Sequence, residues 1–202
     1  MELAPPHCLI PNYLAPQAVE RVTAHALAHA GDLAEATLST PSTQSASTPV
    51  YGIRRARIMN DVGALLPLII PKIHALLPRL WPLLHLEPMA FSRIECQLSV
   101  HGDGDYFNTH TDNGLPDIAH RRVSYVYYFH REPKRFSGGN LRLYNARVEG
   151  GKTTCGALAH DVAPPRNSLM VFPSHIFHEV TPIACPSADL ADQRLTVNGW
   201  LI

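Results

Sequence analysis

The sequence lacks a net charge, because its 17 Lys and Arg residues balance its 17 Asp and Glu residues. Proteins that bind along phosphate backbones carry an excess of basic residues, so this balance argues against nucleic acid as a partner. Charged residues make up only 17% of the chain and hydrophobic residues 46%, which excludes a wholly disordered protein. A length of 202 residues suits a single domain, residues 1–202, with one sizeable core.

Cysteine is scarce, and its four residues (Cys8, Cys96, Cys155 and Cys185) contain no C-x-x-C pair. We therefore expect reduced thiols in a cytoplasmic protein and no disulfide framework. The N-terminal segment has no positively charged region before an apolar run, so we expect no targeting signal. Residues 64–86 are the most apolar stretch, but they include Lys72, Arg79 and four prolines, so we expect no membrane span.

Proline and histidine are abundant, at 18 and 12 residues. Apolar residues at helical spacing predict two helices before residue 90, over 16–30 and from Asp61 onward. An interior proline costs about 3 kcal/mol, so the second helix is expected to kink or restart near Pro78. Between the helices, residues 37–49 are rich in Ser, Thr and Pro and predict an exposed loop.

From Ala90 onward the pattern changes to the two-residue period of β-strands. Strands without intervening helices favour an antiparallel sandwich or barrel, and the simplest architecture is a jelly roll packed against the N-terminal helices. The predicted strands are 94–100, 105–111, 122–130, 140–145, 168–172, 177–181 and 194–201. The glycines of GGKT, residues 150–153, predict a hairpin turn rather than a phosphate-binding loop.

Histidines near carboxylates stand out in the β-rich part. His110 and Asp112, two residues apart on a predicted strand, would project to one face and could coordinate one cation. An earlier copy of this spacing, His101 and Asp103, is interrupted by glycines and predicts a loop. Downstream lie His175 and His178, and Arg194 follows His178 by sixteen residues. Two histidines and one carboxylate form the facial triad of non-haem Fe(II) oxygenases, and an arginine can pair with a cosubstrate carboxylate.

Four motifs occur in a fixed order: HTD at 110–112, GGNLRLY at 138–144, HEVTP at 178–182 and RLTVNGW at 194–200. This set resembles the Fe(II)- and 2-oxoglutarate-dependent dioxygenases, in particular their prolyl 4-hydroxylase-like branch. The resemblance covers residues 90–202, with a weaker match of the N-terminal helices. It implies a double-stranded β-helix, a variety of jelly roll, as the catalytic core over 90–202, with residues 1–89 supplying helical support and substrate-side loops. It also implies Fe(II), 2-oxoglutarate and dioxygen, with ascorbate as a further candidate.

The same resemblance assigns roles to individual residues. His110, Asp112 and His178 match the iron ligands, and Arg194 matches the partner of the C5 carboxylate of 2-oxoglutarate, with Tyr128 assisting. His178 is preferred to His175 because it stands directly before Glu-Val and a nearby proline. The chain departs from the family where a tyrosine about ten residues before the first histidine is replaced by Val100. Tyr106 or Phe107 is then expected to supply an aromatic wall.

We therefore predict hydroxylation of an unactivated C–H bond, with a prolyl residue in a peptide or protein as the favoured substrate. One alternative is a free amino acid or a small metabolite, because one scaffold serves many substrates. A second is a non-catalytic metal-binding jelly roll, although a structural zinc site would close all four positions with protein ligands and need no Arg194. Five further arginines predict a solvated face or, alternatively, a basic rim for an acidic partner: Arg54, Arg55 and Arg57 on one predicted strand, with Arg121 and Arg122. The sequence does not indicate an oligomeric state.

Overall fold

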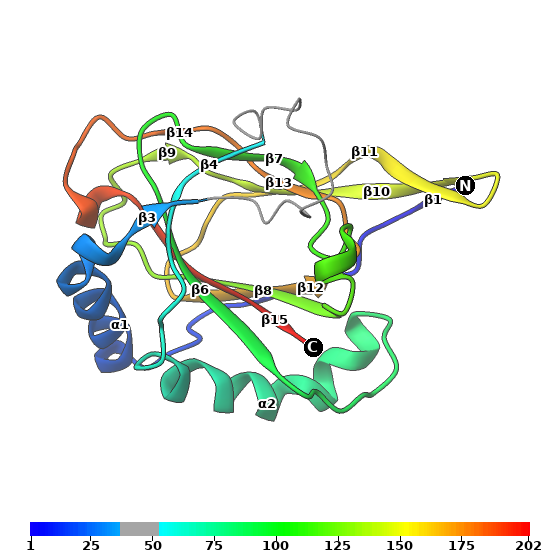
Figure 1. The fold of residues 1–202 in the computed structure, drawn as a ribbon, viewed down its shortest axis with the longest axis horizontal. Helices are drawn as coiled ribbons and strands as arrows, with labels where there is room; N and C mark the ends of the chain where they lie inside the picture. Colours follow the sequence, from blue (N-terminus) through cyan, green and yellow to red (C-terminus); the bar gives the residue numbers. More distant parts are fainter. Residues whose placement is uncertain (37–52) are drawn as a thin grey trace.

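The computed structural model describes residues 1–36 and 53–202. Two antiparallel sheets face each other across a central space, and two helices cover the outer face of one of them (Figure 1). The major sheet runs in the order β2 (Cys8–Ile10), β12 (Ser168–Pro173), β8 (Val123–Tyr128), β15 (Arg194–Leu201), β6 (Ile94–His101), β5 (Arg57–Met59) and β3 (Ala34–Glu35). The predicted jelly roll is confirmed.

The minor sheet runs in the order β1 (Glu2–Leu3), β10 (Leu141–Glu149), β13 (His178–Val180), β7 (Tyr106–His110) and β4 (Arg54–Arg55), with β11 (Lys152–Val162) paired to β10. A short pair, β9 (Ser137–Gly138) and β14 (Ile183–Ala184), lies beside it. Strands β10 and β11 form the hairpin expected at GGKT, where Gly150 and Gly151 adopt positive φ angles of 55° and 75°. The long strand β11 was not predicted.

The major sheet shows why these sequences form strands. Along β6, Leu98 and Val100 are fully buried in the core shared with the helices, whereas Ser99 and His101 face the other sheet. The same alternation along β15 sends Leu195 toward the helices. Each strand therefore has one apolar face and one face with polar groups, and the polar groups of several strands collect in the space between the sheets.

Helix α1 (Pro16–Ala28) begins at the proline that the sequence indicated, and it buries Val19 and Val22. Helix α2 (Leu66–Leu83) begins after Asp61 by five residues and runs through Pro78 as one helix, so the expected restart there is wrong. Its buried apolar face, which includes Ile69 and Ile73, explains the difference. Each of the five buried apolar side chains of α2 contributes about 1.5–3 kcal/mol, which together matches or exceeds the cost of its three interior prolines at about 3 kcal/mol each. Within the described parts of the chain, neither helix combines the length and the apolar character needed to cross a bilayer.

Two further expectations change in the N-terminal part. Arg54, Arg55 and Arg57 were assigned to one strand, but the chain changes sheets at the buried residue Ala56. Strand β4 pairs with β7 of the minor sheet, and β5 pairs with β6 of the major sheet. The loop predicted at 37–49 lies outside the described residues.

Candidate metal centre and adjoining cavity

Neighbouring strands of the minor sheet bring two histidines together. His110 ends β7, His178 begins β13, and the two residues are direct partners in the antiparallel register. Their ring centroids lie 4.2 Å apart. The two-residue spacing suggested that Asp112 lies on the same strand as His110. It does not, because the chain turns after His110. The turn is fixed by the Asp112 backbone N–H, which donates to Ser174 O at 2.9 Å.

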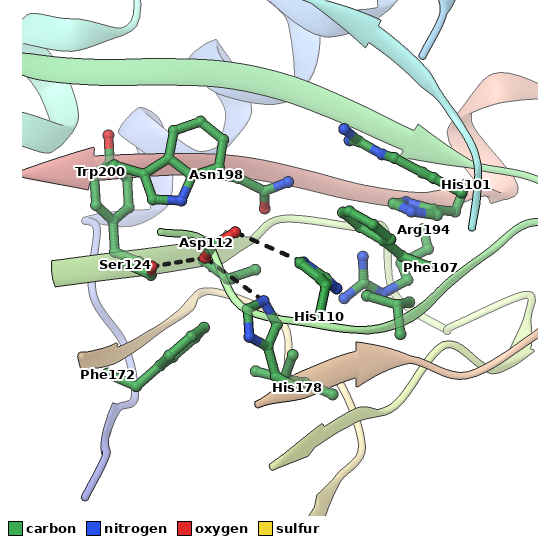
Figure 2. A pocket seen from close by; sticks show the side chains of 15 residues that line it. His101, Phe107, His110, Asp112, Ser124, Phe172, His178, Arg194, Asn198 and Trp200 are labelled. Atoms are coloured by element: carbon green, nitrogen blue, oxygen red, sulfur yellow. Dashed lines mark hydrogen bonds and ion pairs between the residues drawn. The ribbon is translucent and has the colours of Figure 1, made fainter. Parts of the chain in front are cut away.

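The three side chains point toward one another (Figure 2). The Asp112 carboxylate lies 3.6 Å from His110 Nε2 and 3.5 Å from His178 Nε2, and one ligand atom from each residue lies within 4.8 Å of the others. Each imidazole uses its other nitrogen as a donor: His110 Nδ1 to Asn108 O at 2.8 Å and His178 Nδ1 to Ile176 O at 2.9 Å. These bonds fix the tautomer in which Nδ1 carries the proton and the lone pair of Nε2 is free to bind a metal.

The charge state of the group also suits a metal. Burial alone would raise the pKa of Asp112, but His178, His110 and a 2.6 Å hydrogen bond from Ser124 Oγ hold that pKa well below its usual range. Burial, with His110 nearby, lowers the pKa of His178 to about 4. An ionised carboxylate and a neutral imidazole are the forms that bind metal.

Arg194 begins β15 with a side chain that is almost completely buried, at 1% exposure. Its Nε donates to Gly139 O at 2.9 Å, and its guanidinium lies 5.3 Å from the centre of the Tyr128 ring. A Cβ on Gly139, whose φ is +66°, would lie 2.7 Å from the Arg194 side chain, so this glycine makes room for the arginine. Burial lowers the pKa of Arg194, and no described carboxylate forms an ion pair with it. The undescribed segment 37–52 contains no Asp or Glu.

His101 was predicted to lie in a loop, but it is the last residue of β6 and pairs with Arg194 in the register of the major sheet. It is 2% exposed, and neither of its ring nitrogens has a hydrogen-bond partner among the described residues. Val100, where the family resemblance led us to look for a tyrosine, faces the helices instead. Because side chains alternate along a strand, the residue that faces the cavity is His101.

One cavity of about 510 Å³, counted with its open mouth, contains the metal group, Arg194 and His101. Figure 2 shows the metal group between Trp200 and Asn198 on one side and Arg194 and His101 on the other. Other lining residues are Arg54, Phe107, Ser124, Tyr125, Val126, Leu141, Phe172 and Val180. Of the two residues expected to form an aromatic wall, Phe107 lines the cavity and stacks on His110 with ring centroids 3.6 Å apart, whereas Tyr106 does not line it.

The remaining sequence candidates occupy other places. Tyr128 lies next to Arg194 but does not line the cavity, and its buried hydroxyl makes no hydrogen bond of ordinary geometry with a described residue. His175 is exposed in the turn before β13 and is not part of the metal group. Arg121 stacks on Trp200 at 3.6 Å and pairs with Glu95 at 2.7 Å. Of the five arginines considered for a basic rim, Arg54 is the one that lines the cavity.

The jelly roll holds two histidines and a carboxylate beside a buried arginine. This arrangement is typical of the active sites of metal-dependent oxygenases. The sequence model of the 2OG-Fe(II) oxygenase superfamily matches residues 96–202, which is more than half of the chain. The chain belongs to this superfamily, and membership implies Fe(II), 2-oxoglutarate and dioxygen.

Individual relatives agree with this assignment. An uncharacterised PKHD-type hydroxylase from Synechocystis sp. is 34% identical over 192 residues, which are 95% of this chain and 61% of that protein, so the chain spans less than two thirds of this curated relative. The crystal structure of a Pseudomonas putida prolyl-4-hydroxylase superimposes with a TM-score of 0.65 at 22% identity, covering 98% of this chain and 92% of that one. A Trichoplax adhaerens prolyl hydroxylase in complex with a hypoxia-inducible-factor peptide fragment gives 0.62 at 19% identity, covering 98% and 83%. These two structures show that the fold is shared.

Proposed function

We propose that this 2-oxoglutarate-dependent oxygenase hydroxylates a prolyl residue in a peptide or protein. The observation that carries the catalytic part is the meeting of His110, Asp112 and His178 in one cavity with Arg194, a buried cation that no described carboxylate neutralises. A structural zinc site would need a fourth protein ligand, and the described residues near the group supply three. This difference argues against a non-catalytic metal-binding module.

The residues present fit both groups that the family implies. A set of two imidazole nitrogens and one carboxylate oxygen suits Fe(II) and leaves coordination positions for other ligands. Arg194 would hold the C5 carboxylate of 2-oxoglutarate in a charge-assisted pair, with Tyr128 beside it. When bound, the metal and 2-oxoglutarate supply the oxidising chemistry that places an oxygen atom on carbon.

The chain's own contribution is positioning. The backbone carbonyls of Asn108 and Ile176 fix the two imidazoles, and Ser124 fixes the carboxylate of Asp112. Aromatic residues on both sheets, such as Phe107 and Phe172, exclude water from the metal group. A substrate C–H bond held next to this group needs little further ordering to react.

The substrate assignment is supported by the kinds of protein that this chain resembles. The Pseudomonas putida structure is a prolyl-4-hydroxylase, and the Trichoplax adhaerens enzyme is seen with a peptide fragment. Residues 113–122, which directly follow Asp112, are polar and suit an extended peptide segment at the mouth. A free amino acid or small metabolite is the alternative substrate. Use of ascorbate and a cytoplasmic location stay predictions.

Substrate-stimulated formation of succinate from 2-oxoglutarate, with added Fe(II), tests the proposal. A library of proline-rich peptides is compared with a panel of free amino acids, and products are examined by mass spectrometry for the gain of one oxygen atom. We expect peptide hydroxylation that the Asp112→Ala variant lacks. Coupling to a free amino acid with no active peptide would replace the prolyl-peptide substrate by the alternative.

A further inference from the structure

A second arginine lines the cavity and has no role in the site described so far. Arg54, on β4, places its guanidinium carbon 4.9 Å from the centre of the Phe107 ring. The Phe107 ring stacks on the ring of His110, at 3.6 Å and an angle of 14°. A guanidinium, a phenyl ring and an imidazole therefore form one stack that ends at a candidate metal ligand.

Neutral groups hold the Arg54 side chain in place. Its Nη2 donates to Gln97 Oε1 at 3.0 Å and to Ser99 Oγ at 3.2 Å, and Ser99 Oγ also accepts from Asn198 Nδ2 at 2.9 Å. Its Nε is buried without a hydrogen-bond partner among the described residues. The guanidinium is thus oriented by one nitrogen while another donor remains unused.

The charge of Arg54 has no ion-pair partner, although the nearby Asp112 carboxylate partly stabilises it. No described carboxylate forms an ion pair with it, and segment 37–52 contains no acidic residue that could do so. The next residue, Arg55, is the opposite case, because its side chain is 66% exposed and its Nε lies 3.0 Å from Asp105. Burial lowers the pKa of Arg54 to about 10, which keeps it charged at neutral pH. A buried charge without a partner is unfavourable, so an anionic partner that arrives with a ligand would stabilise it.

The charges around the cavity lead to the same conclusion. Among the described lining residues, Asp112 is the one acidic side chain and faces two guanidiniums, those of Arg54 and Arg194. A divalent metal raises this excess from one positive charge to three, and the two negative charges of 2-oxoglutarate reduce it to one. One further carboxylate would neutralise the cavity.

We propose that Arg54 is a substrate-recognition residue that pairs with a carboxylate of the substrate, close to the carbon that is hydroxylated. This inference rests on the proposed function and narrows its substrate class. The carboxylate has two sources: an Asp or Glu side chain beside the target residue of a peptide, or the α-carboxylate of a free amino acid or C-terminal residue. A planar guanidinium binds either in the same bidentate manner.

Matched acid and amide ligands test this assignment. The pairs are a proline-containing peptide with Asp or Asn next to the proline, the same peptide ending in an acid or an amide, and free proline or prolinamide. Binding is measured by calorimetry to the full chain loaded with Mn(II) and 2-oxoglutarate without dioxygen, so no turnover is required. We expect the acid of at least one pair to bind roughly tenfold or more tightly than its amide, and the responding pair identifies the source.

Variants locate the preference. Arg54→Gln should abolish the difference between acid and amide, Arg54→Lys should retain part of it, and the matched control Arg55→Gln should retain all of it. The affinity for 2-oxoglutarate should stay the same in Arg54→Gln. A wild-type protein that binds acids and amides equally would overturn the inference without any variant, and so would a loss of 2-oxoglutarate binding in Arg54→Gln. Arg54-dependent binding of acids, together with no hydroxylated peptide in the succinate assay, would retain the carboxylate-binding role of Arg54 and refute prolyl hydroxylation.

Discussion

The two sheets contribute different parts of the site and differ in how they are supported. The minor sheet supplies His110 and His178 from paired strands, whereas the major sheet supplies Arg194 and His101 from another pair. Both helices pack on the major sheet, and its central strands are almost completely buried. The minor sheet ends in the hairpin of β10 and β11 (Figure 1). Most side chains of β11 are exposed.

The two halves also differ in their hydrogen bonds. Near the metal group, both Nδ1 atoms and the Asp112 carboxylate have partners within the chain. On the major sheet, the His101 ring nitrogens and the Tyr128 hydroxyl are buried without hydrogen bonds to described residues. Buried polar groups usually have partners, so their absence here indicates that a ligand completes this half. Near the metal group, by contrast, hydrogen bonds within the chain already orient the side chains, as a preorganised binding site requires.

The largest expected effect is on the minor-sheet half. Replacing Asp112 or His178 by alanine should abolish metal binding and turnover while the fold is retained, because one of three ligands is lost. Calorimetry with Mn(II) and circular dichroism measure the two properties. Added metal should raise the thermal unfolding midpoint of the wild type by mass action and leave the variants unchanged. His175→Ala, an exposed neighbour in the same segment, should behave like the wild type, and metal loss in this control would contradict the assignment of His178.

The difference in support between the sheets predicts unequal effects on stability. Ile73→Ala removes a fully buried side chain of α2 beneath the major sheet and should lower the free energy of unfolding by about 2–5 kcal/mol. Leu158→Ala removes a side chain of β11 that is 47% exposed and should change it by about 0.5 kcal/mol or less. Urea denaturation measures both. Equal losses would show that the hairpin contributes to the core as strongly as the helices do.

Arg194 tests the major-sheet half of the site. Loss of a charge-assisted pair worth about 1.5–3 kcal/mol should weaken 2-oxoglutarate binding roughly ten- to a hundred-and-fifty-fold in Arg194→Met. Metal affinity should change little, because His110 and His178 lie on the minor sheet and Asp112 lies in the turn after β7. Arg166→Met is a matched control, since its Nε also donates to a backbone carbonyl, His130 O at 3.0 Å, but it does not line the cavity. Unchanged 2-oxoglutarate affinity in Arg194→Met would refute its role as the carboxylate partner.

The contrast between the halves also explains what the sequence could predict. The ordered motifs and the family resemblance that they carry selected His110, Asp112, His178 and Arg194 as candidates, and the structure brings all four to one cavity. His101 was missed because the glycines that follow it predicted a turn, so the strand was ended at Val100, one residue before the position that faces the cavity. The extension of β6 to His101 is seen in its pairing with Arg194 of β15, 93 positions away in the sequence, and it has no local sequence signal.

Arg54 was predicted as part of a solvated face or a basic rim, and its place in the cavity was not predicted, for a related reason. A short sequence with three arginines, 54, 55 and 57, is typical of a solvated face. Arg55 does pair with Asp105, and Arg57 donates a hydrogen bond to Gln193, both outside the cavity. The change of sheet at Ala56 separates Arg54 from Arg57 and directs Arg54 to the cavity. Such a change is a consequence of tertiary packing and has no local sequence signal.

The smallest expected effect concerns two adjacent tyrosines of β8 that face opposite sides of the major sheet. Tyr128→Phe removes a hydroxyl that lies near the Arg194 guanidinium but makes no hydrogen bond of ordinary geometry with a described residue, so the stability of the ligand-free protein should change little. The affinity for 2-oxoglutarate should fall roughly two- to tenfold, because a neutral hydrogen bond contributes about 0.5–1.5 kcal/mol. Tyr127→Phe is the matched control: its hydroxyl donates to Asn167 Oδ1 at 3.1 Å in the core beneath the sheet.

The control should show the reverse pattern, with about 0.5–1.5 kcal/mol of stability lost and 2-oxoglutarate binding unchanged. Thermal unfolding of the ligand-free variants and calorimetry with 2-oxoglutarate separate the two outcomes. If Tyr128→Phe instead lowered stability and left binding intact, its hydroxyl would serve the fold, as that of Tyr127 does. The cavity-facing side of the major sheet would then be completed by the chain rather than by the cosubstrate.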